Sequence, residues 1–486
     1  MILEALTLLA IAAPHESPEH DAAPAAAESG VAVPASEAWR SERPKAGAPK
    51  PPKLPKYDQA VLDNGLTIIV AEVDTVPIVS FSLVTKGGSM LDPKGGAGLA
   101  SITYELMGES TQALSALEFS DAVADLGASF ASHGDRDRGS VSISGLASNA
   151  DGMLALLADA ALRPRFDPKD FERVKSQTIA SLLRRRGSPQ GLAFEQVPAL
   201  IYGEDHPYGH PPTGSVDSVQ TLDLDAVKKF FERMMSPKHS ALLVAGSMPL
   251  AEVKALAEKH LGKWKRDVEA LPEVPAAAPK ARAGIVLIDK PGAAQTMTII
   301  GRPLFERGHP DEAALTLAND VYGGSFASRL NMNLREDKAI TYGAGSSAAF
   351  RQGTGVFIAY SAIRADATAL GLKEIFAELE GMTKTPPTEE EVGRARDALI
   401  KSLSGTFERS GAIAGAAATL FVYGLPLDYY DKITAKYDAA DLASVRAAAA
   451  KYFDPSVMQI LLVGDAAGIA MEIDKLGLGK LEMRKP

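Results

Sequence analysis

The chain contains no cysteine among its 486 residues, which excludes disulfide bonds and catalysis by a thiol nucleophile. It also lacks an excess of basic residues, since 51 Lys and Arg stand against 61 Asp and Glu and the formal net charge is −10. Nonspecific binding to nucleic acid needs basic surface, so this balance argues against a nucleic-acid partner. The compartment stays open, because a cysteine-free chain suits oxidising and reducing environments alike.

Histidine is scarce as well, and the 8 histidines do not form a helical metal-binding pair. His206 and His210 have the spacing i, i+4, but Pro207 and Pro211 interrupt their segment, which therefore cannot be a helix interior. We expect both histidines to lie in a loop. A Ser-His-Asp set is not visible either, so the sequence gives no support to an independent enzyme that uses other catalytic residues.

Long apolar runs are also missing. The apolar run of residues 2–13 is too short to cross a membrane, which takes about 20 residues. Its length suits the core of a signal peptide, and the Ala-Ile-Ala at 10–12 resembles a cleavage site. Although Glu4 interrupts the run and no basic residue precedes it, we expect an exported, periplasmic protein with no stable membrane span. The alternative is a cytoplasmic protein with a short apolar N-terminus.

The composition is that of a globular protein, with 46% hydrophobic and 23% charged residues. The chain is too long for one ordinary core and implies two domains or more. A stretch rich in Ala, Pro, Glu and Lys follows the N-terminal run, and a second Ala/Pro/Lys linker lies near the middle. The predicted organisation is a signal segment and linker at 1–56, an N-terminal domain at 57–270, a linker at 271–280 and a C-terminal domain at 281–486.

The order of elements repeats. A helix at 222–235, a proline and a strand at 241–246 return as a helix at 441–453, a proline and a strand at 459–465. The copies lie roughly 220 residues apart, which indicates duplicated domains rather than a solenoid. In the second copy a long helix opens at Thr388, with a glutamate three residues later, the pattern of a capping box.

Each half reads as α+β. The first half shows a strand–turn–strand pattern around Asn64-Gly65, with further elements in the order strand, helix, strand, strand and helices. These are a strand at 78–84, a helix at 116–126, strands at 128–132 and 139–146, and helices over 150–186. We therefore expect two duplicated domains, each a mainly antiparallel sheet with helices packed on it.

One apolar helical run carries a specific resemblance. Residues 95–111 lead from glycines into a run that ends at Gly108. The run resembles the zinc helix of the pitrilysin-like (insulinase) metallopeptidases, the inverted zincins, whose pattern is Gly-x-Ala-His-x-x-Glu-His-Met. In this chain Ser101, Tyr104 and Glu105 stand at the His, Glu and His positions. The resemblance covers about 57–464 and implies that the duplicated halves form half of a clamshell chamber.

The substitutions remove the metal chemistry. Two histidines at i and i+4 can reach one zinc ion, and the glutamate is the general base toward the zinc-bound water. A serine is a poor ligand, and a tyrosine, whose unperturbed pKa is near 10, is a poor base at neutral pH. By the resemblance the third ligand falls at Ala180 or Ser181, and neither has a carboxylate. We expect this chain to bind no metal or other cofactor.

A second motif lies in the other half. Gly323, Gly324 and Ser325 let the chain turn before a predicted helix whose apolar face includes Phe326, Leu330 and Leu334. Arg335 and Tyr342 follow with six residues between them, like the Arg-x6-Tyr pair of the same family. The resemblance implies that the arginine holds a substrate carbonyl and the tyrosine hydroxyl bonds the developing oxyanion. It also makes the Gly-Gly-Ser turn a candidate substrate-binding segment.

Together the two motifs predict the non-zinc subunit of a heterodimeric zinc metallopeptidase that hydrolyses peptides in a closed chamber. A homologous partner chain would hold the zinc ion, and this chain would supply Arg335 and Tyr342. The alternative is a catalytically inactive scaffold or peptide-binding protein of the same fold. The Arg-x6-Tyr pair favours the first reading, because a scaffold has no need of it.

Overall fold

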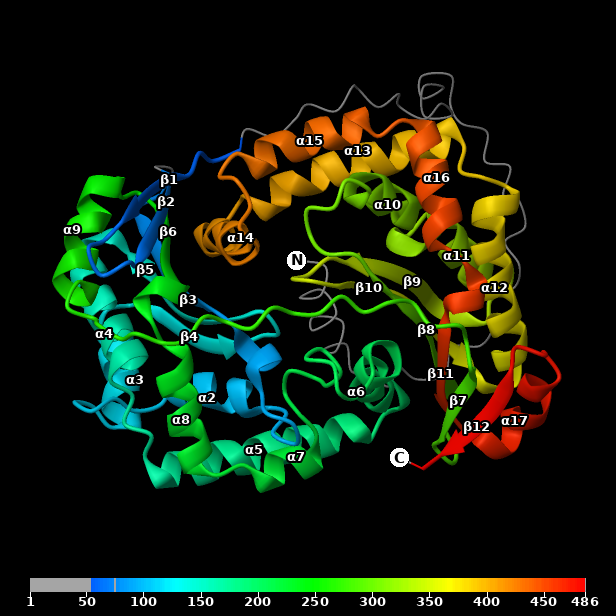
Figure 1. Cartoon of the computed structure of the whole chain (residues 1–486), viewed down its shortest axis with the longest axis horizontal. Helices are drawn as coiled ribbons and strands as arrows, with labels where there is room; N and C mark the ends of the chain where they lie inside the picture. Colours follow the sequence, from blue (N-terminus) through cyan, green and yellow to red (C-terminus); the bar gives the residue numbers. More distant parts are fainter. Residues whose placement is uncertain (1–53, 74–75, 486) are drawn as a thin grey trace, which may run out of the picture. The chain divides into compact units, whose positions relative to one another are not determined.

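The computed structural model describes residues 54–73 and 76–485. The predicted signal segment, its cleavage site and nearly all of the linker at 1–56 lie outside these residues. The described chain contains two six-stranded sheets with helices packed on them, which confirms the predicted α+β class (Figure 1). Within it, no helix is both long and apolar enough to cross a bilayer.

The first sheet has the strand order β1-β2-β6-β3-β5-β4, and all its neighbours are antiparallel except β2 and β6. Its strands are β1 (Asp58–Val61), β2 (Thr67–Glu72), β3 (Ile78–Lys86), β4 (Ser129–Gly134), β5 (Arg138–Leu146) and β6 (Ser240–Gly246). The predicted Asn-Gly turn joins β1 to β2, where Gly65 adopts φ 91°, a conformation that glycine adopts without strain.

The second sheet has the order β12-β7-β11-β8-β10-β9. Its strands are β7 (Gly284–Asp289), β8 (Gln295–Leu304), β9 (Thr341–Ala349), β10 (Gly355–Arg364), β11 (Gln459–Gly464) and β12 (Lys480–Arg484). β6 lies between β2 and β3, and β11 lies between β7 and β8, so a strand from late in each half pairs with two strands from its start. Five strands share this order, which is the duplication that the repeated helix–proline–strand pattern predicted. The edge strand differs, because β1 pairs antiparallel with β2 whereas the C-terminal β12 pairs parallel with β7.

The helices follow the same repeat. The first half has α2 (Leu99–Met107), α3 (Ala116–Asp125), α4 (Ala150–Leu162), α5 (Pro168–Arg186), α6 (Pro189–Tyr202), α7 (Val216–Thr221), α8 (Leu224–Met234) and α9 (Leu250–Leu261). The second half has α10 (Glu312–Asn319), α11 (Arg329–Asn331), α12 (Thr368–Lys384), α13 (Glu389–Thr406), α14 (Ser410–Tyr423), α15 (Tyr429–Ala439), α16 (Leu442–Tyr452) and α17 (Ala466–Asp474). The predicted capping box of Thr388 and Glu391 opens α13. Residues 264–283, which include the predicted linker, carry no helix or strand.

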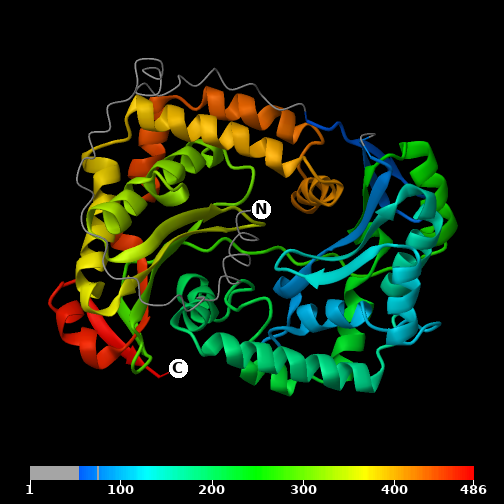
Figure 2. The same cartoon turned by 180° about the vertical axis from the view of Figure 1, so that it is seen from behind.

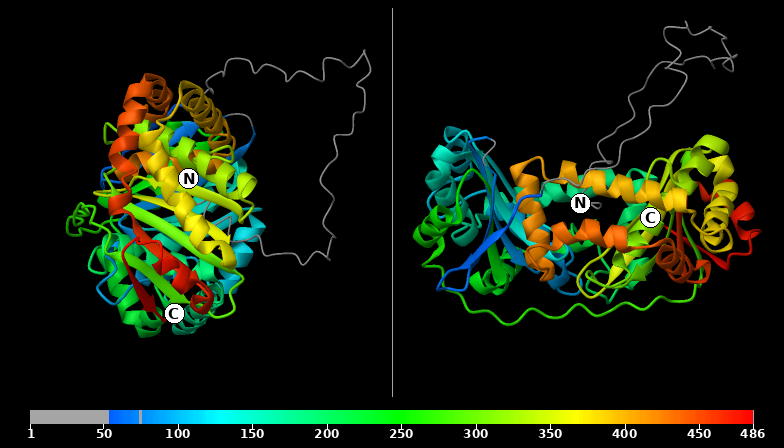
Figure 3. Two further views of the ribbon diagram at one scale, coloured as in Figure 1. Left: turned by 90° about the vertical axis from the view of Figure 1, so that its right-hand side faces the viewer. Right: turned by 90° about the horizontal axis from the view of Figure 1, so that it is seen from above.

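The two halves exchange helices. α6 of the first half packs on β8 and β11 of the second sheet, and α14 of the second half packs on β3 and β6 of the first (Figures 1 and 2). α13 and α15 run from the second sheet toward the first (Figure 3). α14 is apolar on nearly all sides, and its Ile413 and Ala417 belong to one buried cluster with Leu243 of β6. A helix that is hydrophobic all round must be buried, which this exchange achieves.

A buried polar cluster joins the equivalent hairpins of the two halves. The carboxylate of Asp137, in the β4–β5 turn, accepts hydrogen bonds from the hydroxyls of Tyr208 and of Tyr423, the latter at 2.7 Å. Arg351, after β9, lies 3.7 Å from the same carboxylate. Burial raises the pKa of Asp137, and Arg351 opposes that rise. Because each charge faces an opposite charge or a donor, the halves meet without an unpaired buried ion here.

Candidate functional site

Helix α2, the predicted relic of a zinc helix, forms as expected. It begins after Gly98, whose φ is 95° and where a Cβ would lie 2.9 Å from the Thr213 carbonyl oxygen, so the position requires glycine. The half-buried Asp92 carboxylate accepts the N–H groups of Gly98 and Ala100, each at 2.8 Å, at the helix N-terminus. Burial nevertheless raises the pKa of Asp92 to about 7. The local frame of the motif is therefore intact.

Tyr104, at the position that the resemblance assigns to the catalytic base, is 1% exposed. Its ring lies over Gly139 of β5, so closely that a Cβ on that glycine would be 1.7 Å from the ring. The hydroxyl has no hydrogen-bond partner among the described residues, and burial raises its pKa well above the usual value. A neutral, buried phenol cannot take a proton from water at neutral pH.

The remaining zinc positions do not gather ligands. Ser101 is half-buried and Glu105 is exposed on α2, while Ala180 is exposed and Ser181 half-buried on α5, which packs against α2. Desolvation and then the nearby Glu109 raise the pKa of Glu105. In the described part of the chain, no group of three or more His, Asp or Glu is placed to hold a metal ion. These residues do not fit a zinc ion.

The histidines that were expected in a loop do lie in one. His206 and His210 fall between α6 and α7. The ring of His206 stacks on Tyr202 at 5.1 Å between centroids, and its Nε2 lies 3.0 Å from the carbonyl oxygen of Pro275. Burial lowers the pKa of both histidines. His206 thus packs against the segment that joins the two halves.

The predicted helix around Phe326 is wrong in its start. The chain forms a π-helical turn at Asp320–Gly324, is extended at Ser325 and Ser328, and becomes helical only at Arg329. A second π-helical stretch covers Met332–Asp337. Because the extended residues break the helical period, Phe326 is 62% exposed, whereas Leu330 and Leu334 are fully buried.

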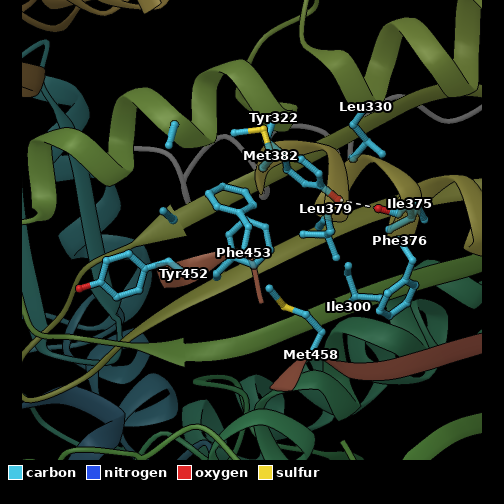
Figure 4. Close-up of a cluster of buried hydrophobic side chains, with 14 of the residues drawn as sticks. Ile300, Tyr322, Leu330, Ile375, Phe376, Leu379, Met382, Tyr452, Phe453 and Met458 are labelled. Carbon is cyan, nitrogen blue, oxygen red and sulfur yellow. Dashed lines mark hydrogen bonds between the residues drawn. The ribbon is translucent and has the colours of Figure 1, made fainter. Parts of the chain in front are cut away.

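Those two leucines anchor the segment to the core of the second half. Leu330 lies in the cluster formed by α10, α12, α16 and the sheet, where Tyr322 donates its hydroxyl to the carbonyl of Ile375 at 3.3 Å (Figure 4). Tyr322, Phe357 and Phe453 pack ring against ring, with centroids 5.0–5.9 Å apart. The polar residues on the other side of the segment are thereby held at the surface.

The Gly-Gly-Ser turn has a packing explanation. A Cβ on Gly323 would be 2.6 Å from the Ser346 hydroxyl, and one on Gly324 would be 2.9 Å from the Asn319 side-chain nitrogen. The Ser325 hydroxyl donates to the carbonyl of Asp320 at 3.3 Å. Gly323 thus allows the turn to approach β9, and Gly324 allows it to approach the end of α10. A role of the turn in substrate binding stays a prediction.

Arg335 and Tyr342 are both presented at the surface. The half-exposed guanidinium of Arg335 lies 4.7 Å from the centroid of the Phe326 ring, and its Nε is 3.2 Å from Glu336. Tyr342 is 90% exposed, the highest value among the large hydrophobic side chains of the described residues. The pair offers hydrogen-bond donors to a ligand.

A β-bulge sets the direction of Tyr342, a feature that the sequence reading missed. Ala344 pairs with Ser361 and Thr341 with Ile363, so Tyr342 and Gly343 both lie opposite Ala362. Bulges redirect side chains and are common beside active sites. Part of the signal was available in Gly343, because a glycine inside a strand pattern suggests a bulge.

Comparison with known proteins defines the class. Residues 68–208 match the model of the insulinase family, peptidase family M16, and residues 221–399 match that of the peptidase M16 inactive domain. The chain belongs to the peptidase M16 (insulinase) family.

Among its relatives, a protein of Rickettsia felis named "Uncharacterized zinc protease" is 25% identical over 352 residues, 71% of this chain and 83% of that protein. A Bacillus subtilis protein named "Uncharacterized zinc protease YmxG" is 21% identical over 349 residues, 72% of this chain and 84% of that protein.

Two solved structures share the fold. A peptidase M16 inactive domain from Pseudomonas fluorescens has a TM-score of 0.78 at 24% identity, and the alignment covers 84% of this chain and 98% of the Pseudomonas chain. A protease from Helicobacter pylori has a TM-score of 0.79 at 23% identity, and the alignment covers 85% of this chain and 100% of the Helicobacter chain. Both similarities concern the fold.

Proposed function

We propose that this chain is the non-zinc subunit of a heterodimeric metallopeptidase. A homologous chain with an intact His-x-x-Glu-His helix holds the zinc ion, and peptides are hydrolysed at that ion within a chamber that both chains enclose. The observation that carries the proposal is a contrast within the molecule. Tyr104 is buried against Gly139 at the position of the base, whereas Arg335 and Tyr342 stand exposed beside a turn and a bulge.

The contribution of this chain to the reaction follows from its donors. The guanidinium of Arg335, supported by the Phe326 ring, holds a carbonyl oxygen of the substrate backbone through a charge-assisted hydrogen bond. The hydroxyl of Tyr342 donates to the oxygen that becomes anionic when water attacks. A preorganised donor of this kind lowers the barrier by about 2.7–4 kcal/mol. Metal, base and attacking water all belong to the partner.

A scaffold or peptide-binding role is the second candidate. It is favoured by the match of residues 221–399 to a family model described as inactive. The two candidates differ in what they predict for Arg335 and Tyr342, since a scaffold uses neither side chain in chemistry. In either case we propose that the protein is exported, as its apolar N-terminal run suggests.

The test is reconstitution. This chain is purified alone, and then together with any zinc-bearing family member that co-purifies with it at native expression level. We expect no stoichiometric zinc and no peptide cleavage by the chain alone, one zinc ion per heterodimer, and cleavage that needs both chains. Equimolar zinc that stays with the isolated chain through dialysis, or full activity of the partner alone, would overturn the proposal.

A further inference from the structure

The bulge beside Tyr342 needs hydrogen-bond partners that the sheet does not supply. Two residues of β9, Tyr342 and Gly343, lie opposite the single residue Ala362 of β10, so the ladder of backbone bonds is interrupted. Tyr342 and Gly343 are exposed, but the flanking Thr341 and Ala344 are half-buried, and half-buried backbone groups need hydrogen-bond partners from elsewhere. The partners that replace the ladder decide how firmly the Tyr342 side chain is directed.

Side chains on both sides of β9 fill this gap. The Gly343 N–H donates to the Thr341 hydroxyl at 3.2 Å, and the Gly343 carbonyl accepts from the buried Ser361 hydroxyl at 3.1 Å. On the other side, the N–H of Ala344 donates to Oδ1 of Asn331 at 3.0 Å. The backbone that follows Tyr342 is therefore held from β10 by a serine and from the helical segment by an asparagine.

Asn331 makes a second bond that leads to Arg335. Its Nδ2 donates to the carbonyl of Phe326 at 2.8 Å, and the ring of that phenylalanine supports the guanidinium of Arg335. The Asn331 side chain is 3% exposed and lies between the two buried leucines of its segment in sequence. One planar amide thus uses its acceptor toward the tyrosine strand and its donor toward the residue beneath the arginine.

We propose that Asn331 is a positioning residue that sets Arg335 and Tyr342 relative to one another; this inference rests on the proposed function. An amide is required because the site needs one acceptor and one donor in the same plane. Aspartate keeps the acceptor for Ala344 and loses the donor to Phe326, and alanine loses both. Fully satisfied buried polar groups of this kind specify one arrangement of their neighbours.

The chain provides a matched control in Asn333, two residues away in the same segment. Its Nδ2 donates to Glu374 and Glu378 of α12, at 3.0 and 2.7 Å, away from the bulge. Asn333→Ala therefore removes an equally local amide without touching β9. Ser361→Ala loosens the bulge from the opposite side and keeps the helical segment intact, so it serves if Asn331 variants do not fold.

The first measurement is amide hydrogen exchange across 341–346 in the full-length chain alone. We expect Asn331→Ala and Ser361→Ala to speed exchange there by about fivefold, as expected for one lost hydrogen bond, and Asn333→Ala to leave it unchanged. Unchanged exchange in both Asn331→Ala and Ser361→Ala, or equal acceleration in Asn333→Ala, would overturn the positioning role, whether or not the proposed function is correct.

The second measurement is turnover by the zinc-bearing complex. We expect Asn331→Ala to lower kcat by about fivefold or more. Asn331→Asp should mainly raise KM, because it loses only the bond to Phe326, the residue whose ring supports Arg335. If Tyr342→Phe lowers kcat but Asn331→Ala does not, the positioning role is wrong and the proposed function stands. If neither changes turnover while exchange accelerates, the proposed function has failed and the positioning role in catalysis falls with it.

Discussion

Helix α2 and the segment 320–342 differ in what each has kept. α2 is a regular helix whose N-terminus is bonded by Asp92, and the positions that the resemblance assigns to zinc chemistry hold a half-buried serine, a buried tyrosine and an exposed glutamate. Segment 320–342 is irregular, with two π-helical stretches and a bulge, yet it presents an arginine and a tyrosine at the surface. Irregular backbone costs stability and is found mainly at functional sites. The comparison teaches that a regular backbone can persist without reactive side chains, while an irregular backbone can present them.

The largest effect is expected from a change at Tyr342, in segment 320–342. In the zinc-bearing complex Tyr342→Phe removes one oxyanion donor and keeps the ring, so kcat should fall by about 10²-fold or more while assembly and zinc content stay unchanged. Steady-state kinetics with a fluorogenic peptide measure this. Tyr360→Phe, on the neighbouring strand β10, is the control and should have no such effect. Unaltered turnover in Tyr342→Phe would favour the scaffold reading.

The next effect is expected at Arg335. Arg335→Ala removes a charge-assisted bond of about 1.5–3 kcal/mol to the substrate backbone, so KM should rise by roughly tenfold or more. Arg335→Lys should restore only part of the loss, because an ammonium is a point charge without the guanidinium fork. Initial rates over a range of peptide concentrations separate KM from kcat. Full rescue by lysine would show that charge alone matters.

A prediction for the other region concerns the tyrosine over β5. Gly139→Ala places a methyl group inside the Tyr104 ring, so the free energy of unfolding should fall by about 1–3 kcal/mol. The same change in a Tyr104→Ala background should cost much less, which a double-mutant cycle in urea measures. Additive effects of the two changes would mean that the ring does not pack on this glycine.

The smallest effect is expected from restoring histidines to α2. Ser101→His combined with Glu105→His should give no peptide hydrolysis by the chain alone, because the base position holds Tyr104 and the third ligand position offers Ala180 or Ser181. Zinc analysis after dialysis and a peptide assay check this. Hydrolysis by the double variant would show that α2 retains more of the chemistry than its side chains suggest.

Much of the fold was readable from the sequence because its signals are local. The capping box at Thr388, the Asn64-Gly65 turn and the repeated helix–proline–strand order each depend on residues close together in the chain. The start of the helix near Phe326 was misread for a related reason. Apolar spacing alone suggested one continuous face, and it could not show the extended residues that interrupt it.

The sequence by itself determined which side chains stand at the positions that the resemblance assigns to zinc chemistry: alanine has no ligand atom, serine is a poor ligand, and Glu105 offers a single carboxylate. Tertiary structure alone decided the rest. It placed Tyr104 over Gly139, exchanged α6 and α14 between the sheets, and turned Tyr342 outward on a bulge. These features depend on contacts between residues far apart in the chain or on how strands pair, which composition and periodicity do not encode.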